Sequence, residues 1–173
     1  MSAFFKRFSR TVRHLGFAVS GSAERHLPQA VRSRLQARIA ASESLHTGQI
    51  RIYAESSLPL SYLSRNAPAR ERALTLFGKL RVWDTEGNNG VLIYLLMAEH
   101  AIEIVADRGL NPHATARHWQ EMIAQMRSPL RAGHWEEGLV LAIDKVSALL
   151  ESHFPAEPGD ARSNELPDAP IIR

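Results

Sequence analysis

The sequence predicts an α/β fold, namely a three-layer α/β/α sandwich with a small mixed sheet. Two observations support it. Apolar residues recur at helical spacing up to about residue 44 and then at alternate positions from residue 50, and the stretch 91–97 is apolar throughout, as in a central strand covered on both faces. We expect the order helix, strand, helix, strand, strand, helix, helix, with a right-handed crossover that makes the first two strands parallel.

The size of the chain allows one sizeable core, since it has 173 residues with 45% hydrophobic content. We expect three parts: a basic amphipathic arm over residues 1–26, the α/β/α domain over 27–155 and a flexible tail over 156–173. The longest apolar run, 91–98, is far shorter than the roughly 20 residues of a membrane-spanning helix. No such helix is predicted.

Composition and charge limit the kinds of metal site and partner that the chain can have. The chain has no cysteine, which excludes disulfides, thiolate nucleophiles and zinc–thiolate sites, so a metal must be held by oxygen or imidazole ligands. Residues 1–38 hold eight basic residues and one acidic residue, whereas the remainder holds 13 basic and 17 acidic residues. This asymmetry indicates a basic arm that meets an anionic partner.

The arm combines apolar residues at helical spacing with basic residues between them. The apolar set is Phe4, Phe8, Val12 and Leu15, and the basic set is Lys6, Arg7, Arg10 and Arg13. This pattern predicts an amphipathic helix, with an anionic membrane surface or a membrane-protein partner meeting residues 1–25. A flexible arm and a helix packed on its own domain are the alternatives. The Arg and Ser content also resembles an organellar transit peptide, while a secretory signal is disfavoured because the apolar stretch is short.

The first half of the domain begins with a helix at Pro28 that runs to about Ser44, because proline suits the first helical position and apolar residues recur every four positions. A strand follows from Ile50. Pro68 opens a second helix, which leads through a turn-forming cluster into the apolar strand. A short connection at 98–100 predicts a hairpin, so the third strand should run antiparallel to the second.

The second half is predicted to be helical. Asn111 and Pro112 fit the N-cap and first position of a helix, and Pro129 should end or break it. A last helix is expected from about His134. Beyond Pro155 the Pro, Gly, Asp and Ser content predicts a disordered or extended tail.

This topology gathers polar residues at one rim of the sheet, where strands one and two begin and strand three ends. The gathered residues are Glu43, His46, Thr47, Asp84, Glu86, Asn88, Asn89, Asp107 and Arg108. Converging carboxylate and amide oxygens suit Ca²⁺ or Mg²⁺. We therefore expect a cation site, with the metal ligands Asp84, Glu86, Asn88, Asn89 and Asp107. The alternative is that these residues only satisfy turn backbone.

Other sites rank lower. The loop after residue 83 is not an EF-hand, because Asn89 and Leu95 stand where that motif needs glycine and glutamate. The opposite rim, with fewer polar groups, holds Glu55, Ser56, Ser57, Glu99 and His100. The sequence lacks a nucleophile elbow, a phosphate-binding glycine loop and a His-Glu-x-x-His motif. Nucleic-acid binding is disfavoured because the domain shows no basic face with stacking aromatics.

Several segments resemble the TPM domain family, in its short proteobacterial type. They are Glu43-x-x-His46-Thr47-Gly48-Gln49-Ile50-Arg51, Asn89-Gly90-Val91-Leu92-Ile93-Tyr94 and Glu103-Ile104-Val105-Ala106-Asp107-Arg108-Gly109, with Trp119, the stretch 133–138, Phe154-Pro155 and the ending 164–168. The resemblance implies the α/β/α sandwich, a divalent-cation site and, by analogy to a plant relative, acid phosphatase activity. Gln49 departs from it, since relatives often carry Glu there. We also expect neither the secretory signal nor the C-terminal membrane helix that many longer relatives carry.

We therefore expect a divalent-cation-binding accessory domain with a membrane-surface or protein-partner role. The alternative is a metal-dependent acid phosphatase acting on phosphomonoesters, with Arg108 steadying developing charge and Asp84 or Asp107 as nucleophile or base. Whether the protein is an enzyme stays open. The expected location is the cytoplasm, including the periphery of the inner membrane.

Overall fold

The computed structural model describes residues 3–20, 22–157 and 164–173, and it has seven α-helices and four strands there. The helices are α1 (Ala3–Ser20), α2 (Ser22–His26), α3 (Gln29–Glu43), α4 (Leu60–Ser64), α5 (Ala69–Lys79), α6 (Ala116–Arg131) and α7 (Trp135–His153). The strands are β1 (Gln49–Glu55), β2 (Gly90–Leu96), β3 (Ala101–Ala106) and β4 (Ile171–Ile172), and short 3₁₀ turns cover Met97–Glu99 and Arg108–Leu110.

The strands form one mixed sheet in the order β3-β2-β1-β4. β1 and β2 are parallel, with Gln49 opposite Gly90, and β2 and β3 are antiparallel, with Val91 opposite Ala106. Both predicted pairings are confirmed. These two pairings place the starts of β1 and β2 and the end of β3 at the same rim of the sheet.

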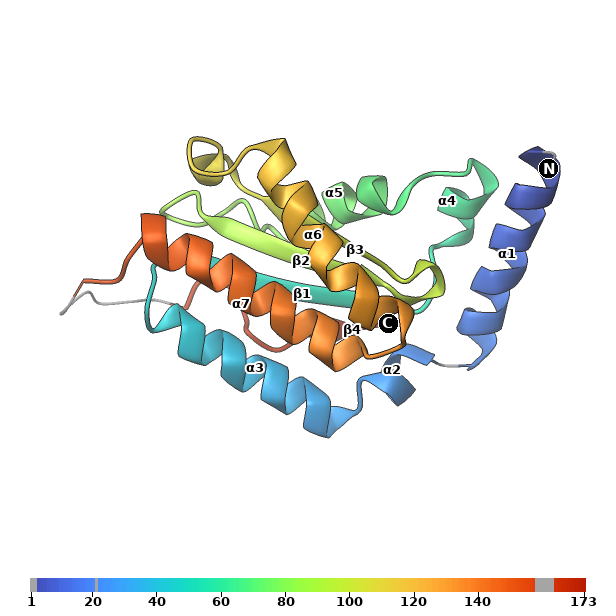
Figure 1. Ribbon diagram of the computed structural model, residues 1–173, viewed down its shortest axis with the longest axis horizontal. Coiled ribbons are helices and arrows are strands. Elements are labelled where there is room, and N and C mark those ends of the chain that lie inside the picture. Colours follow the sequence, from blue (N-terminus) through green and yellow to red (C-terminus); the bar gives the residue numbers. More distant parts are fainter. Residues whose placement is uncertain (1–2, 21, 158–163) are drawn as a thin grey trace.

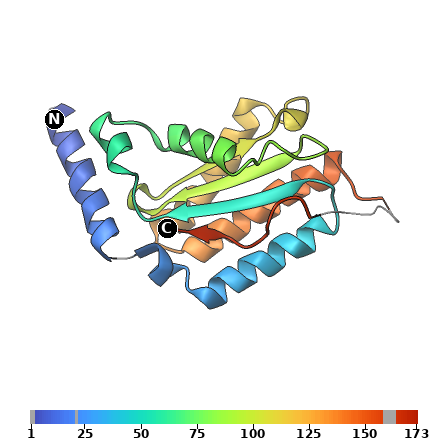
Figure 2. The ribbon, with the colours of Figure 1, turned by 180° about the vertical axis from the view of Figure 1, so that it is seen from behind.

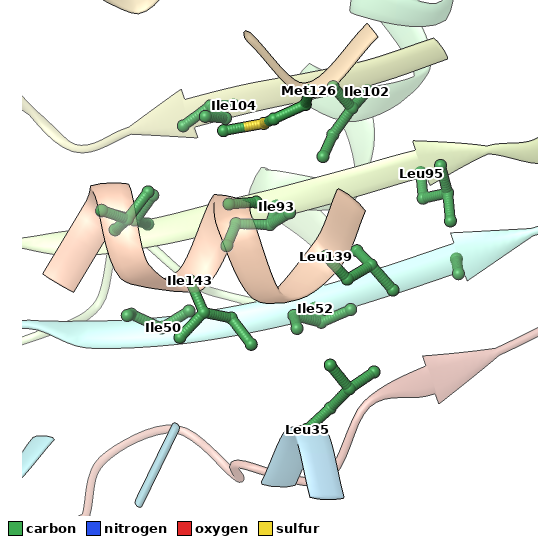
Figure 3. Close-up of a cluster of buried hydrophobic side chains, with 14 of the residues drawn as sticks. Leu35, Ile50, Ile52, Ile93, Leu95, Ile102, Ile104, Met126, Leu139 and Ile143 are labelled. Carbon is green, nitrogen blue, oxygen red and sulfur yellow. The ribbon is translucent and has the colours of Figure 1, made fainter. Parts of the chain in front are cut away.

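Helices cover the two faces of the sheet, as Figures 1 and 2 show. On one face, side chains of alternate strand positions pack against α3, α6 and α7, and Figure 3 shows Ile50, Ile93 and Ile104 beside Met126 and Ile143. Each strand contributes two residues at alternate positions, because the strand period of two turns every second side chain to the same face. They are Ile50 and Ile52 of β1, Ile93 and Leu95 of β2, and Ile102 and Ile104 of β3.

The other face packs against α4 and α5. Here Tyr53, Leu92 and Tyr94 of the strands lie with Ala73 and Leu76 of α5. All seven residues of β2 are buried, as its uninterrupted apolar sequence predicted. The predicted three-layer α/β/α sandwich is therefore confirmed.

Helix α6 corrects two sequence predictions. Asn111 and Pro112 do not start it, because residues 108–114 form turns anchored by the buried Leu110. The helix starts instead at Ala116, where the N-cap Thr115 accepts a hydrogen bond from His118 N–H. Pro129 does not end it either, since the helix continues to Arg131. A missing N–H so near a helix end removes a single hydrogen bond, and Leu130 beside it is fully buried.

The tail differs from the expected flexible segment over residues 164–173. Ile171 and Ile172 pair in parallel with Tyr53 and Ala54 of β1 and add a fourth strand to the sheet. Gln49 Oε1 accepts hydrogen bonds from Glu165 N–H and Leu166 N–H, at 2.9 and 3.0 Å. The free edge of β1 supplies the backbone partners that order this segment. Residues 158–163 lie outside the described part.

Helix α1 stands at one end of the molecule, beside the loop that follows α4 (Figures 1 and 2). The amphipathic helix predicted from the pattern between Phe4 and Leu15 is confirmed in its backbone and runs on to Ser20, while the side chains of Phe4, Lys6 and Arg7 lie outside the described residues. Within the described part, every helix is too short or too polar to cross a membrane.

Candidate functional site

The predicted rim exists, and backbone hydrogen bonds tie its loops together. Asp107 N–H donates to Gly90 O at 2.9 Å, and Gly109 N–H donates to Asn88 O at 2.9 Å. A Cβ atom on Gly109 would lie 2.5 Å from Asn88 O. Glycine at this position lets the loop before β2 and the turn after β3 approach each other directly.

Three of the predicted residues come together at this rim. Arg108 Nε donates to Asn88 Oδ1 at 3.0 Å, and Arg108 N–H donates to Asp107 Oδ1 at 2.7 Å. Asn88 has a φ of 50°, a left-handed conformation that asparagine tolerates better than most residues. This turn directs its side chain towards the residues that follow β3.

Asp107 stands out among the polar groups of the rim. The residue is 8% exposed, and its Oδ2 atom is buried without a hydrogen-bond partner among the residues that the structure describes. Burial of an unpaired carboxylate oxygen costs free energy unless a proton or a cation compensates it. Asp107 is therefore the carboxylate of this rim best placed to receive a ligand.

The other three predicted ligands have separate environments. Asp84 forms an ion pair with Arg81 on its own exposed turn. Glu86 N–H donates to Glu165 Oε2 of the tail at 3.0 Å. Asn89 is buried, with its N–H donating to Thr85 Oγ1 at 3.1 Å.

Asn89 Nδ2 also donates to Thr47 Oγ1 at 3.2 Å, so this side chain links the starts of β2 and β1. The described residues contain no group of three histidine, aspartate or glutamate side chains that could hold a metal. The five predicted ligands thus share a rim without forming one cluster of carboxylates.

Glu43 and His46 at the same rim bind backbone. Glu43 Oε1 accepts a hydrogen bond from Ile50 N–H at 2.7 Å, and burial raises the pKa of its carboxyl group to about 7. His46 Nδ1 lies 3.0 Å from Gly48 O. Both side chains thus contact the backbone where β1 begins.

The opposite rim, ranked second from the sequence, contains a buried ion pair. Glu55 accepts two hydrogen bonds of 3.0 Å from Arg72 of α5 and one of 2.6 Å from Tyr94 Oη. Arg72 and the Tyr94 hydroxyl were missed in the sequence. Tyr94 itself could have indicated this network, because it is the phenolic residue of an otherwise apolar strand and a buried hydroxyl needs a polar partner.

Two further residues of that rim contact helices. Glu99 binds Arg10 and His14 of α1, and His100 stacks on Trp135 with ring centroids 4.8 Å apart. A hollow of about 310 Å³ lies nearby, lined by Ala18, Glu24, Glu55, Ser56, Ser57 and Arg173.

A second hollow, of about 580 Å³, follows the outer edge of β3 between α5 and α6. Arg70 of α5 donates to Ile104 O there, and Trp119 and Arg127 of α6 form part of the lining. Arg70 therefore satisfies one carbonyl of the exposed sheet edge.

The fold and the rim define a class of protein: a three-layer α/β/α domain with a polar loop cluster beside the first residues of its parallel strands. The model of the TPM domain family matches residues 23–149. The chain belongs to this family, which confirms the resemblance of its sequence.

A solved structure shows the same fold. It is the NMR structure of the BA42 protein from the psychrophilic bacterium Bizionia argentinensis, with a TM-score of 0.71, 24% sequence identity and coverage of 83% of this chain and 93% of that one. Among curated proteins, none matches the sequence.

Proposed function

We propose that the protein is a TPM domain that binds a divalent cation, Ca²⁺ or Mg²⁺, at the rim formed by Asn88 and Asp107. The observation that carries this proposal is the buried Asp107 Oδ2 without a partner in the described part of the chain. A hard cation prefers oxygen ligands and would compensate the charge of this carboxylate.

Asn88 supplies a second oxygen. Its Oδ1 accepts from Arg108 Nε, and the Arg108 side chain is exposed, so it can turn into solvent when a cation arrives. Water and backbone carbonyls would complete the coordination, as is common for both ions. The exposed carboxylates of Asp84 and Glu86 would attract cations to the rim without binding them directly.

A thermal melt with Ca²⁺, Mg²⁺ or K⁺ tests this proposal. We expect a divalent ion to raise Tm in the wild type, because a ligand that binds only the folded state stabilises it. Asp107→Asn should abolish the rise without unfolding the apo protein, since it removes the charge of a buried carboxylate whose Oδ2 atom lacks a hydrogen-bond partner in the described part of the chain and keeps an oxygen for Arg108 N–H. Asp84→Asn is the matched control and should keep most of the rise. An unchanged rise in Asp107→Asn would contradict the proposal.

The alternative function is a metal-dependent acid phosphatase. One observation favours it: Arg108 lies directly beside Asp107 and could neutralise phosphoryl oxygens. Hydrolysis of a phosphomonoester by the wild type should then require the divalent ion and fall at least about 100-fold in Arg108→Gln. Arg117→Gln is the control, because Arg117 is an exposed arginine paired with Glu121 on α6. Activity that survives Asp107→Asn would point to a contaminating phosphatase.

A further inference from the structure

Helix α1 turns four of its large apolar residues away from the domain, whereas Phe17 packs against the core. Phe8, Val12, Leu15 and Val19 are between 51% and 87% exposed, and their spacing of four, three and four places them along one side of the helix. We call these four residues the apolar stripe. Few soluble helices leave such a continuous row of large apolar side chains in water.

The side of α1 that meets the domain combines Phe17, whose ring lies edge-on to that of His100, with polar residues. Arg10 donates to Glu99 Oε1 at 2.6 Å, to Asn66 Oδ1 at 2.9 Å and to Ala67 O at 2.7 Å. His14 is fully buried beside it. These contacts hold α1 to the loop after α4 and to the turn between β2 and β3.

His14 is fixed through both ring nitrogens. Leu58 N–H donates to Nδ1 at 3.1 Å, so Nδ1 must be an acceptor, and Nε2 donates to Glu99 Oε1 at 2.9 Å. Burial acts to raise the pKa of Glu99, but the hydrogen bonds from His14 and Arg10 outweigh it and hold that pKa below its ordinary value. The helix is therefore attached in one orientation.

This orientation is the reverse of the one that amphipathicity alone favours. A helix packed on its own domain normally buries its apolar side, because burial removes that surface from water. Here His14 is buried and the apolar stripe is exposed. The stripe is thus available to a partner while α1 remains attached to the domain.

Charge identifies the partner that fits this surface. The sequence of α1 contains four basic residues and no acidic residue. The structure describes the side chains of two of these basic residues, Arg10 and Arg13. Of these two, Arg10 forms an ion pair with Glu99. Arg13 is exposed. Two such helices placed together in a dimer would repel each other, whereas an anionic lipid surface attracts them and accepts the apolar stripe.

We propose that α1 lies flat on an anionic lipid bilayer, with the apolar stripe inserted at the boundary between headgroups and acyl chains. The helix of 18 residues would contact the surface over about 27 Å. The contacts of His14 and Arg10 with Glu99 would then fix how the domain is presented to the membrane. This inference is independent of the cation site, which lies at the other rim of the sheet.

Vesicle flotation of the full chain tests the proposal, using vesicles of phosphatidylglycerol and phosphatidylcholine in equal parts and vesicles of phosphatidylcholine alone. The wild type should float with the anionic vesicles and lose binding at high salt. Leu15→Glu should weaken partitioning by about tenfold or more, since it places a charge where the proposal inserts an apolar side chain into the bilayer. Leu74→Glu on α5 is the matched control, because Leu74 is 50% exposed and Leu15 is 51% exposed.

Both variants change exposed residues and should keep the wild-type circular dichroism and melting temperature. The proposal is overturned if the wild type does not float with anionic vesicles, or if Leu15→Glu and Leu74→Glu bind them equally well. It is also overturned if light scattering shows a dimer that Leu15→Glu dissociates while flotation is absent, since the stripe would then bind a second copy.

Discussion

The Tyr94 hydroxyl donates a 2.6 Å hydrogen bond to Glu55 Oε1, across the neighbouring strands β2 and β1. Burial, followed by the charge of Glu55, raises the pKa of Tyr94 far above its ordinary range, so the phenol stays protonated and donates. Arg72 binds the same carboxylate from α5. A buried polar network therefore joins the sheet to the helical layer at this rim.

Removing different members of this network should have unequal effects on the free energy of unfolding. Tyr94→Phe loses one hydrogen bond and should cost about 1–3 kcal/mol, because Glu55 keeps Arg72. Glu55→Ala leaves a largely buried guanidinium unpaired and should cost about 3–5 kcal/mol. Urea unfolding with unchanged m-values measures both. Equal losses in the two variants would contradict this interpretation of the network.

Glu43 should make stability depend on pH. Its folded-state pKa of about 7 lies above the ordinary value of 4.5, so the folded state binds more protons than the unfolded state between these values. The free energy of unfolding should then fall as pH rises from 4.5 to 7, by up to about 3 kcal/mol. Glu43→Gln should remove this fall while keeping the acceptor for Ile50 N–H. Parallel pH profiles for the variant and wild type would disprove it.

Gly109 should not tolerate a side chain. A Cβ there would meet Asn88 O at 2.5 Å and Gly87 O at 3.0 Å, and backbone atoms cannot move aside cheaply. Gly109→Ala should cost about 1–3 kcal/mol and abolish any stabilisation by divalent ions, because it separates the two loops of the rim. Gly78→Ala is the control. Nothing lies within 4 Å of its added Cβ, and alanine in helix α5 should stabilise the protein by up to about 1 kcal/mol.

Gln49 should hold the tail against β1. Its Oε1 accepts from two successive backbone amides, those of Glu165 and Leu166. Gln49→Leu should speed hydrogen exchange at these amides by about tenfold, the loss expected from roughly 1.4 kcal/mol of hydrogen bonding. Exchange in β2 should stay unchanged. Retained protection at both amides would show that Arg51 and β4 suffice to order the tail.

Most of the architecture could be predicted from the sequence because its signals are local. The alternation from Ile50 onwards and the apolar run of β2 follow the strand period, and the short connection at 98–100 implies the antiparallel third strand. The start of α6 was mispredicted because Asn111 and Pro112 are suited to a turn as well as to a helix start. The buried Leu110 settles the choice, and burial depends on tertiary contacts.

The rim was predictable and its side-chain contacts were not. Strand direction alone brings Asn88 and Asp107 to one edge, but the pairing of Asp84 with Arg81 depends on the local conformation of an exposed turn. The orientation of α1 likewise could not be predicted from the sequence. Its amphipathic pattern allowed either side to face the domain, and the choice depends on Glu99, which lies 85 residues beyond His14.

The sheet places its final strand, β4, beside its first, β1. During synthesis, β1 and β2 leave the ribosome long before residues 171–172 and can pair at once, while the outer edge of β1 waits uncovered for its neighbour. Such a delay exposes unpaired backbone groups to other nascent chains. The pairing of residues 171–172 with Tyr53 and Ala54 therefore follows the pairing of β1 with β2, and this edge of β1 stays open to misassembly until it forms.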